Sequence, residues 1–545
     1  MENMDGWHGW LGGASERWRS ALVGVVAASL LLQACAPASS SGGAGAEITR
    51  KNMNIRLEGN WGNQLNHLQA GSTNPTLTIN ASMYDRLVGA TPDGKNFVPY
   101  VAESWTVNSV TSTTFKIRKG ITCSDGTPLD AKAVANHFQH VIDPSYKANQ
   151  SYRLLGGDDG GPYTVTYDDA AQTMTITSGP NSQMVQNLAL PHIQIICPAG
   201  FEPGADFNKN SYGSGEFVLD SVTADTVKVK RRPEWTWGPN GTKATDPGVP
   251  DTITFKVVEN ATTAANQLIT GELDLIPVRG PDVLRLRQEK DLNESVAYST
   301  TLAYMTMNED PSRVTSDKRV REALMTAIDP MAWNQAANNG EGGPGTSILS
   351  EKFACYSKET ANLLPNPPGD TAKAHQMLLA AGFTEGADGK LSREGKPLRL
   401  EVLTQPLLNS GPEYIAEQFN RMGAVGVVVQ SANTTLANDG KFDINFYPGA
   451  NVLPSVGFAL GVVSGPIPPV GGNSARIKDP VNEDLLLKAK ADAGCQGWYD
   501  WQNHLITEAH ILPLNTLKYS WFGRNTAPVF IMSAYADAST YKWVK

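Results

Sequence analysis

Short segments in which apolar and polar residues alternate with a period of two occur throughout the first half of the chain. Such alternation is typical of strands that bury one face against a core. Phe115 and Ile117 fall on one such face, and a turn expected around Asn108 joins their strand to the preceding one as a hairpin. The strands expected in this half are 54–57, 104–107, 114–118, 164–167, 173–176, 216–219 and 226–230.

Apolar residues at helical spacing lie between and after these strands. Thr127, followed by a proline and by Asp130, predicts a helix start with Thr127 as its N-cap. Asp317 and Asp370 are expected to cap two later helices, the second of which stops at Gly382. In the second half, helices are also expected at about 412–422, 482–493 and 496–511, and strands at 398–403, 426–429 and 442–446. This alternation predicts a mixed α/β lobe.

The length and charge of the chain limit the possible functions. At roughly 100 to 200 residues per domain, 545 residues allow about two to four domains. The 45 basic and 54 acidic side chains give a net charge of −9 without any Lys/Arg-rich run, so nucleic acid is not expected as a partner. The mean hydropathy is −0.28, and no apolar stretch approaches the about 20 residues of a membrane span, which excludes a polytopic membrane protein.

The N-terminus is typical of an export signal. Arg17 and Arg19 precede the apolar run 21–32, which is short for the ~30 Å of a bilayer core but fits a signal peptide. Cys35 and a Ser/Gly-rich segment follow, and this junction resembles the bacterial lipobox, in which the cysteine is lipidated. We therefore expect a signal peptide at 1–34 and a lipidated tether at 35–50, which would anchor an exported protein on the outer face of the cytoplasmic membrane. The alternative is an ordinary signal peptide with an incidental cysteine.

Four further cysteines fall into two regions of the chain. An even number of cysteines in an oxidising compartment favours disulfides. We predict that Cys123 pairs with Cys197 and that Cys355 pairs with Cys495, the alternative being four free buried thiols.

Motifs that carry catalysis or bind metals and nucleotides are missing from the sequence. The sequence contains no GxSxG, HExxH or Walker motif. His137 and His140 lie on one predicted helix, but without a carboxylate or cysteine at matching spacing we expect them on a solvated face. We expect no catalytic residue, no metal ligand and no cofactor. The pairs Trp235 with Trp237 and Trp498 with Trp501 are expected mainly in the core, with one or two of them possible ligand contacts.

Eight strings, in order along the chain, carry a resemblance to a known family. The segment 84–88 reads YDRLV, 98–105 reads VPYVAESW, and 124–129 reads SDGTPL. The other strings are 115–121, 212–217, 271–275, 317–329 and 380–383. Together they resemble the family 5 extracellular solute-binding proteins, which are the peptide-binding receptors of ABC importers.

The resemblance implies an α/β fold of the two-lobed periplasmic-binding-protein type with an additional inserted domain, three domains in all. Two segments cross between the lobes, and Gly213 and Gly215 are expected where a crossing needs an unusual φ. The expected divisions are lobe I at 51–82, 211–303 and 513–545, inserted domain II at 83–210, and lobe III at 304–512.

In peptide-binding members of the family, an Asp in a Trp-containing stretch holds the α-amino group of the ligand. The corresponding stretch here, 446–454, has neither residue, so Tyr447 and Asn451 are expected to contact a neutral or blocked ligand end. Asn60 and Trp61 are expected to contribute from the first lobe. The resemblance implies a lipoprotein that captures a peptide or peptide-like solute and delivers it to ABC permease subunits served by separate ATPases. The alternatives are a transport-independent receptor that regulates an envelope process and, more remotely, an exported hydrolase.

Overall fold

The computed structural model divides the chain into two compact units, Met1–Glu47 and Ile48–Lys545. It describes residues 51–62, 65–68, 74–91, 96–146, 161–179, 190, 193–351, 355–404, 409–430, 435–448, 461–492, 494–528 and 538–544, all in the second unit. The expected tether 35–50, with Cys35, therefore lies outside the described part, and so does Asn451. Within that part, no helix has the length and apolarity that a membrane crossing requires.

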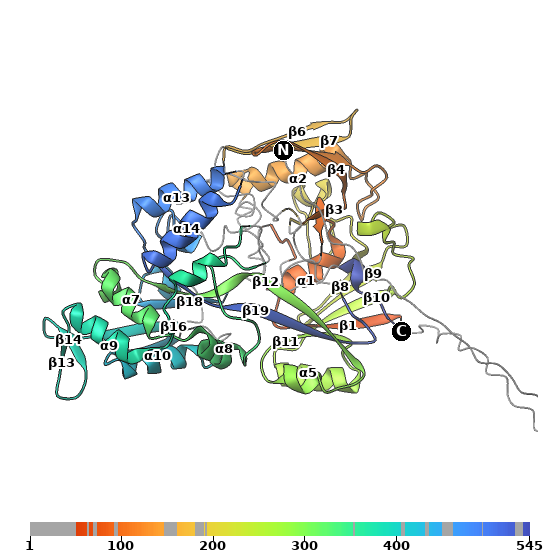
Figure 1. Ribbon diagram of the computed structural model, residues 1–545. Coiled ribbons are helices and arrows are strands. Elements are labelled where there is room, and N and C mark those ends of the chain that lie inside the picture. The colour runs from red at the N-terminus through yellow and green to blue at the C-terminus, as the bar shows by residue number, and fades with distance from the viewer. Residues whose placement is uncertain are drawn as a thin grey trace, which may run out of the picture. The chain divides into compact units, whose positions relative to one another are not determined.

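Helices and strands alternate along the described chain as the pattern predicts (Figure 1). The α-helices are α1 (Asn74–Met83), α2 (Ala131–Ile142), α5 (Ala261–Thr270), α6 (Asp282–Leu286), α7 (Lys318–Thr326), α8 (Pro330–Asn338), α9 (Thr371–Ala380), α10 (Gly411–Arg421), α11 (Thr435–Asn438), α13 (Pro480–Ala491) and α14 (Gln496–Thr507). The strands are β1 (Asn52–Leu57), β2 (Val88–Ala90), β3 (Phe97–Pro99), β4 (Ala102–Ser109), β5 (Ser112–Ile117), β6 (Thr164–Asp168), β7 (Thr173–Thr177), β8 (Phe217–Val222), β9 (Thr226–Arg231), β10 (Thr252–Val257), β11 (Leu275–Val278), β12 (Leu292–Met307), β13 (Thr384–Glu385), β14 (Leu391–Arg393), β15 (Lys396–Pro397), β16 (Arg399–Thr404), β17 (Val425–Gln430), β18 (Ile444–Pro448) and β19 (Ile511–Arg524).

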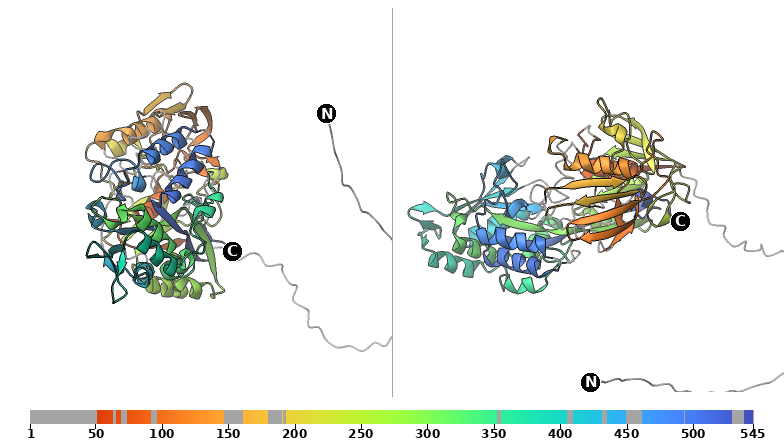
Figure 2. Two further views of the ribbon diagram at one scale, coloured as in Figure 1. Left: turned by 60° about the vertical axis from the view of Figure 1, so that its left-hand side comes forward. Right: turned by 90° about the horizontal axis from the view of Figure 1, so that it is seen from above.

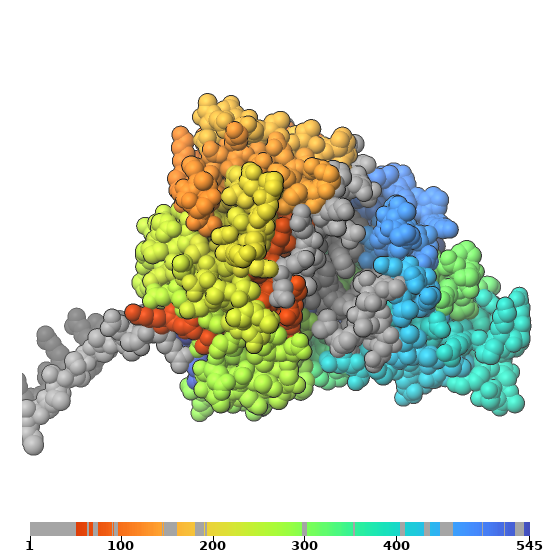
Figure 3. Space-filling model, turned by 180° about the vertical axis from the view of Figure 1, so that it is seen from behind, coloured from red at the N-terminus to blue at the C-terminus, as the bar shows by residue number. Residues whose placement is uncertain are grey.

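A ten-stranded sheet connects the two halves of this unit. Its order is β17-β16-β18-β12-β19-β11-β1-β10-β9-β8, so strands from the N-terminal half occupy one end and strands from the C-terminal half the other. The long strands β12 and β19 pair with each other in the middle and run across both halves (Figure 1). Seen from behind, residues before about 280, red to yellow-green, form one side of the surface, and those after about 400, cyan to blue, form the other (Figure 3).

The N-terminal end of this sheet is organised by β1. β1 runs parallel to β10 on one side and to β11 on the other, and Met53, Ile55 and Leu57 are buried on its inner face as period-two alternation predicts. Because parallel strands place their carboxyl ends at one edge, the residues that follow β1 and β11 emerge together.

The C-terminal end contains parallel strands β16 and β17 with α10 between them in sequence, the βα pattern that the sequence predicts. Asp317, Asp370 and Asp479 cap α7, α9 and α13, respectively, by accepting backbone N–H groups. Two expectations were wrong in detail: β18 lies two residues later than expected, and α14 ends at Thr507. The chain turns there, and β19 begins at Ile511, where the sequence predicts helix.

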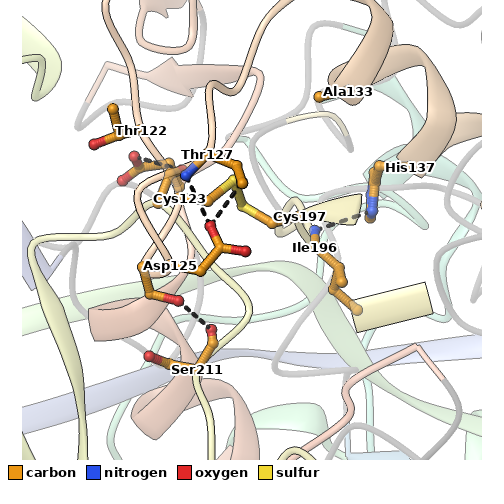
Figure 4. The surroundings of a disulfide bond; sticks show 12 residues. Thr122, Cys123, Asp125, Thr127, Ala133, His137, Ile196, Cys197 and Ser211 are labelled. Carbon is orange, nitrogen blue, oxygen red and sulfur yellow. Dashed lines mark hydrogen bonds between the residues drawn. A yellow bond between two sulfur atoms is a disulfide. The ribbon is translucent and has the colours of Figure 1, made fainter. Parts of the chain in front are cut away.

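A separate four-stranded antiparallel sheet, β4-β5-β7-β6, carries α2 on one side (Figure 2). The hairpin β4–β5 turns at 110–111, two residues beyond the expected turn at Asn108. The N-cap of α2 is Asp130, whose carboxylate accepts from the N–H of Ala133, so the predicted cap at Thr127 was wrong. Thr127 instead donates its N–H and hydroxyl to Asp125 in the turn before the helix (Figure 4).

Both predicted disulfides are present. Cys123 is bonded to Cys197 with 6.1 Å between their Cα atoms, and this bond fastens the turn before α2 to the segment that returns from the small sheet (Figure 4). Cys355 is bonded to Cys495 with 5.1 Å between their Cα atoms, and this bond ties the start of α14 to the loop 140 residues earlier.

Gly213 and Gly215 serve a different purpose from the one expected. Neither has a positive φ among the described backbone angles. A Cβ atom on Gly213 would lie 2.2 Å from the carbonyl oxygen of Met83, and one on Gly215 would lie 2.4 Å from the carbonyl carbon of the same residue. The glycines are needed because two backbones approach closely at the end of α1.

Candidate functional site

The two residues expected to contribute from the first lobe, Asn60 and Trp61, lie in the loop after β1, which ends at Leu57. Asn60 is exposed, and its side chain accepts from the N–H of Gly62 at 2.7 Å and donates to the carbonyl of Ala224 at 3.3 Å. Trp61 is only 2% exposed, and its indole N–H has no hydrogen-bond partner among the described residues. Asn60 therefore shapes a surface loop, whereas Trp61 is mainly a core residue with an unused donor.

The residues expected from the second lobe are only partly described. The backbone of Tyr447 lies in β18, where it pairs with Tyr304 of β12. Asn451 lies outside the described residues. Their contact with a ligand remains a prediction.

A charged pair that the sequence analysis missed lies at the carboxyl ends of β1 and β11. Ile55 of β1 is in register with Leu275 of β11, so Glu58 and Arg279, one residue beyond each strand, emerge at the same edge. Nη2 of Arg279 lies 3.6 Å from Oε2 of Glu58, and both side chains are about one quarter exposed. In open α/β sheets, ligands bind outside the carboxyl ends of parallel strands.

The aromatic ring of Tyr519 on β19 packs against the Arg279 side of this pair. The guanidinium carbon of Arg279 lies 4.0 Å from the centre of the Tyr519 ring, an arrangement that favours a cation over the aromatic face. Burial raises the pKa of Tyr519 to about 12, so the ring stays neutral. Nε of Arg279 is buried and has no hydrogen-bond partner in the described part of the chain. The guanidinium thus contacts Glu58 and Tyr519, and its one buried donor without a partner among the described residues is Nε.

Arg56 of β1 binds the backbone at the carboxyl ends of the neighbouring strands β10 and β11. It is 2% exposed and donates to three carbonyl oxygens at the ends of β10 and β11, those of Val258 at 2.8 Å, Glu259 at 2.9 Å and Pro277 at 2.6 Å. Burial lowers the pKa of Arg56, and the nearby Glu58 carboxylate opposes this effect. A buried cation saturated with carbonyl acceptors fixes the backbone from which Glu58 and Arg279 extend.

A second polar centre joins the inserted region to the sheet. The carboxylate of Asp85 is fully buried and accepts hydrogen bonds from four neutral donors. The donors are the hydroxyl of Tyr100 at 2.9 Å, the hydroxyl of Ser214 at 2.9 Å, the indole of Trp237 at 2.7 Å and the indole of Trp235 at 3.3 Å. Burial raises the pKa of Asp85, and these donors act in the opposite direction. Trp235 and Trp237 are thus structural residues around Asp85 rather than ligand contacts.

His137 is not on a solvated helix face as expected. It is fully buried, and its Nδ1 accepts the backbone N–H of Ile196 at 3.1 Å (Figure 4). Burial lowers its pKa well below the usual value, which keeps the ring neutral. His140 stacks on Phe201 with ring centres 3.9 Å apart. The expectation failed because the segment after Cys197 packs over this face of α2, which periodicity within the helix cannot reveal.

The sequence contains a weak signal for the Glu58–Arg279–Tyr519 cluster. A charged residue directly after an apolar strand is typical of a site at a sheet edge, and both Glu58 and Arg279 fit this description. Their separation of more than 200 residues hides the pairing. Only the parallel register of β1 and β11 brings them together.

Comparisons with known proteins identify the family. A sequence model of the bacterial extracellular solute-binding proteins, family 5 Middle, matches residues 96–461. The nickel-binding periplasmic protein of Escherichia coli K12 is 28% identical over 404 residues, which cover 70% of this chain and 73% of that protein. The glutathione-binding protein GsiB of Escherichia coli O6:K15:H31 is 29% identical over 378 residues, which cover 68% of this chain and 66% of that protein, just under two thirds of its length.

The solved structures show the same fold. The crystal structure of NikA from Brucella suis in complex with Fe(III)-EDTA has a TM-score of 0.74 at 21% identity and covers 90% of this chain and 99% of that chain. The chain therefore has the α/β, two-lobed fold of the periplasmic binding proteins with an additional domain. Since the family match spans well over half of its residues, the chain belongs to the bacterial extracellular solute-binding proteins, family 5.

Proposed function

We propose that the protein is the receptor of an ABC importer and that it delivers a peptide or peptide-like solute carrying a carboxylate to permease subunits served by separate ATPases. Family 5 proteins bind solutes for transport and are not enzymes, so this chain is a binding protein. The relative GsiB is named for glutathione, a short peptide with two carboxylates. This relative supports a solute of similar chemistry.

The observation that carries the proposal is the guanidinium of Arg279, which is about one quarter exposed at the carboxyl ends of β1 and β11 and lies over the Tyr519 ring. A guanidinium binds a carboxylate through two parallel N–H bonds, and such charge-assisted bonds are about twice as strong as neutral ones. Glu58 beside Arg279 reduces the net charge of the site, which favours a solute with both a carboxylate and a donor over a simple anion. Tyr447 and Asn451, together with Asn60 and Trp61, remain the proposed contacts for the rest of the solute.

The substitution Arg279→Gln tests this assignment. The solute that copurifies with the wild-type protein is first identified by mass spectrometry, and its affinity is then measured by calorimetry alongside glutathione and its C-terminal amide. We expect Arg279→Gln to weaken binding of the carboxylate forms by roughly tenfold or more, because a charged hydrogen bond contributes about 1.5 to 3 kcal/mol. Arg279→Lys should lose less than Arg279→Gln.

Arg231→Gln is the matched control, since Arg231 at the end of β9 pairs with Asp251 just before β10, at the opposite end of β10 from these strand ends. Its affinity should equal that of the wild type. Unchanged affinity in Arg279→Gln, or equal binding of the acid and the amide, would contradict the role of Arg279.

We also propose that Cys35 is lipidated and anchors the protein on the outer face of the cytoplasmic membrane. Buried acyl chains contribute about 0.8 kcal/mol per CH₂ group, which is the source of membrane affinity in such proteins. Cys35→Ser should therefore release the protein into the soluble fraction or leave an uncleaved precursor, as judged by fractionation and intact mass. Ser41→Ala, in the same expected tether, serves as the control and should leave the protein in the membrane fraction. Wild-type membrane retention of Cys35→Ser would refute the anchor.

The predicted domain boundaries remain part of this proposal. Passage from lobe I to lobe III is placed at 303–304 and the return at 512–513. Both positions fall within the paired strands β12 and β19, and the β12–β19 ladder is irregular between Tyr298 and Leu302 and between Ala303 and Tyr304. Such irregularities in a ladder bend a strand and support a hinge at this point.

A further inference from the structure

Three side chains in the C-terminal half of the chain converge on one point. Asp479 caps the start of α13, His504 lies in the last turn of α14, and His510 precedes β19. One ligand atom of each residue lies within 4.8 Å of the other two. The three elements, α13, α14 and the beginning of β19, thus meet at this cluster (Figure 1).

The ring nitrogens of both histidines face the same carboxylate oxygen. Nε2 of His504 lies 2.6 Å from Oδ2 of Asp479, and Nε2 of His510 lies 3.1 Å from that same atom. Two imidazole nitrogens and a carboxylate oxygen are a donor set that divalent zinc and nickel accept, while calcium and magnesium prefer oxygen alone.

The carboxylate of Glu309 contacts the other ring nitrogen of His510 and orients the ring. Nδ1 of His510 lies 2.6 Å from Oε1 of Glu309, whose other oxygen lies 3.2 Å from Nη1 of Arg321. Arg321 is 4% exposed and also donates to the carbonyls of Glu508 and Ala509, just before His510. A carboxylate that accepts the distal N–H of a histidine is the usual outer partner of a metal-bound imidazole.

This arrangement leaves a place for a cation. When Nδ1 of His510 donates its proton to Glu309, the neutral ring turns the lone pair of Nε2 toward the carboxylate of Asp479. Two lone pairs at 3.1 Å repel each other unless a proton or a metal ion lies between them, so a metal ion can take the place of that proton. Asp479 and His504 are 20% and 17% exposed, so the cluster lies near the surface.

We propose that Asp479, His504 and His510 bind one divalent transition-metal ion of the zinc and nickel class, with Glu309 as the positioning residue and water in the open positions. The site does not depend on the proposed solute contacts. A bound ion would fasten the starts of α13 and β19 to the end of α14.

Metal titration of the full-length protein tests the proposal. The protein is prepared without a histidine tag, stripped with a chelator and titrated with Co²⁺, whose visible absorption reports nitrogen and oxygen ligation, and with Zn²⁺ by calorimetry. We expect one equivalent of each ion to bind and the thermal midpoint to rise with Zn²⁺, because a ligand of the native state stabilises it. Ca²⁺ should produce neither effect. A wild-type protein without a Co²⁺ spectrum and without stoichiometric Zn²⁺ binding would overturn the site.

Three variants assign the ligands. His504→Gln and His510→Gln should each weaken Zn²⁺ binding at least about tenfold and abolish the Co²⁺ spectrum, and Glu309→Gln should weaken binding while keeping the spectrum. His375→Gln is the matched control, because His375 is also partly buried and lies 3.5 Å from a carboxylate, that of Glu385, but belongs to no such three-residue cluster among the described residues. Circular dichroism checks the fold of each variant. Wild-type Zn²⁺ affinity in folded His504→Gln, or an equal loss in His375→Gln, would refute the assignment.

Discussion

At the scale of single residues, Asp85 shows how a buried charge can connect parts of the chain that are distant in sequence. Its four donors come from residues up to 152 positions away, and each contributes a neutral hydrogen bond to one carboxylate. The segments that converge are the residues after α1, the connection between β3 and β4, the segment 213–215 and the residues after β9. A fully buried carboxylate persists only when its oxygens are satisfied in this way.

Replacing Asp85 should therefore lower stability strongly. In Asp85→Leu, all four donors lose their acceptor, and each buried unsatisfied group costs about 1 to 3 kcal/mol. We expect the free energy of unfolding in urea to fall by at least about 3 kcal/mol, and less in Asp85→Asn, which keeps one acceptor oxygen.

Asp484→Asn, in an exposed ion pair with Lys488, is the control for loss of a surface carboxylate and should change stability by less than about 1 kcal/mol. A stable Asp85→Leu protein, within the error of the wild type, would show that this centre does not hold the segments together.

At the scale of elements, the close approach of the segment 213–215 to the end of α1 fixes how the inserted region joins the sheet. The N–H of Gly215 donates to the carbonyl of Met83 at 2.9 Å, and this contact leaves no room for a side chain on either glycine. The disulfide Cys123–Cys197 lies beside it, since the N–H of Cys197 donates to the carbonyl of Tyr212 at 2.8 Å. Backbone contact thus replaces side-chain packing at this junction.

Gly213→Ala should disrupt this junction. Its Cβ would meet the carbonyl oxygen of Met83 at 2.2 Å, and backbone atoms cannot move aside as a flexible side chain can. We expect a loss of about 2 to 4 kcal/mol in unfolding free energy, comparable to severe overpacking in a core. Gly461→Ala is the matched control, because a Cβ there meets nothing within 4 Å and its φ is not positive. Equal thermal midpoints for the two variants would contradict the argument.

At the scale of the whole molecule, a network of four charges bridges the predicted lobes next to the crossing strands. Arg287 makes paired hydrogen bonds with Glu294, at 2.8 Å each, and with Glu341, at 2.6 and 3.0 Å. Lys518 of β19 completes the network at 3.2 Å from Glu341. Hydrogen bonding to Arg287 lowers the pKa of both carboxyls, so both stay ionised at neutral pH. Arg287 and Glu341 belong to different predicted lobes, which makes this pair sensitive to their relative position.

Glu341→Gln should therefore favour a more open arrangement of the lobes. A partly buried pair of this kind contributes about 1 kcal/mol, which corresponds to about a fivefold change in the ratio of two conformations. Small-angle scattering of the solute-free protein should show a larger radius of gyration for the variant. Glu417→Gln, which removes an exposed pair with Arg421 on α10, should leave the scattering curve unchanged. Identical scattering curves for Glu341→Gln and the wild type would show that this network does not influence the arrangement of the lobes.

Much of the architecture follows from local sequence patterns. Period-two alternation located β1, β5, β6, β7 and β9, and aspartate followed by a helical apolar pattern located α7 and α9, because strand and helix periodicity depend only on near neighbours. The grouping of the four cysteines predicted both disulfides, and the ordered strings from 84 to 383 predicted the family. Cap positions were less certain: Thr127 and Asp130 both satisfy the pattern, and only the backbone angles distinguish them.

The positions of the polar clusters were decided by the tertiary structure alone, because they depend on contacts between segments that are distant in sequence. The parallel register of β1 and β11 places Arg279 beside Glu58, and the meeting of α13, α14 and β19 gathers Asp479, His504 and His510. The segment 196–201 packs on His137, and the approach of α1 explains Gly213. A sequence specifies the periodicity of each element, but the partner of a buried polar side chain is set by how elements pack. Charged and polar residues brought together over hundreds of positions therefore appear only in the folded chain.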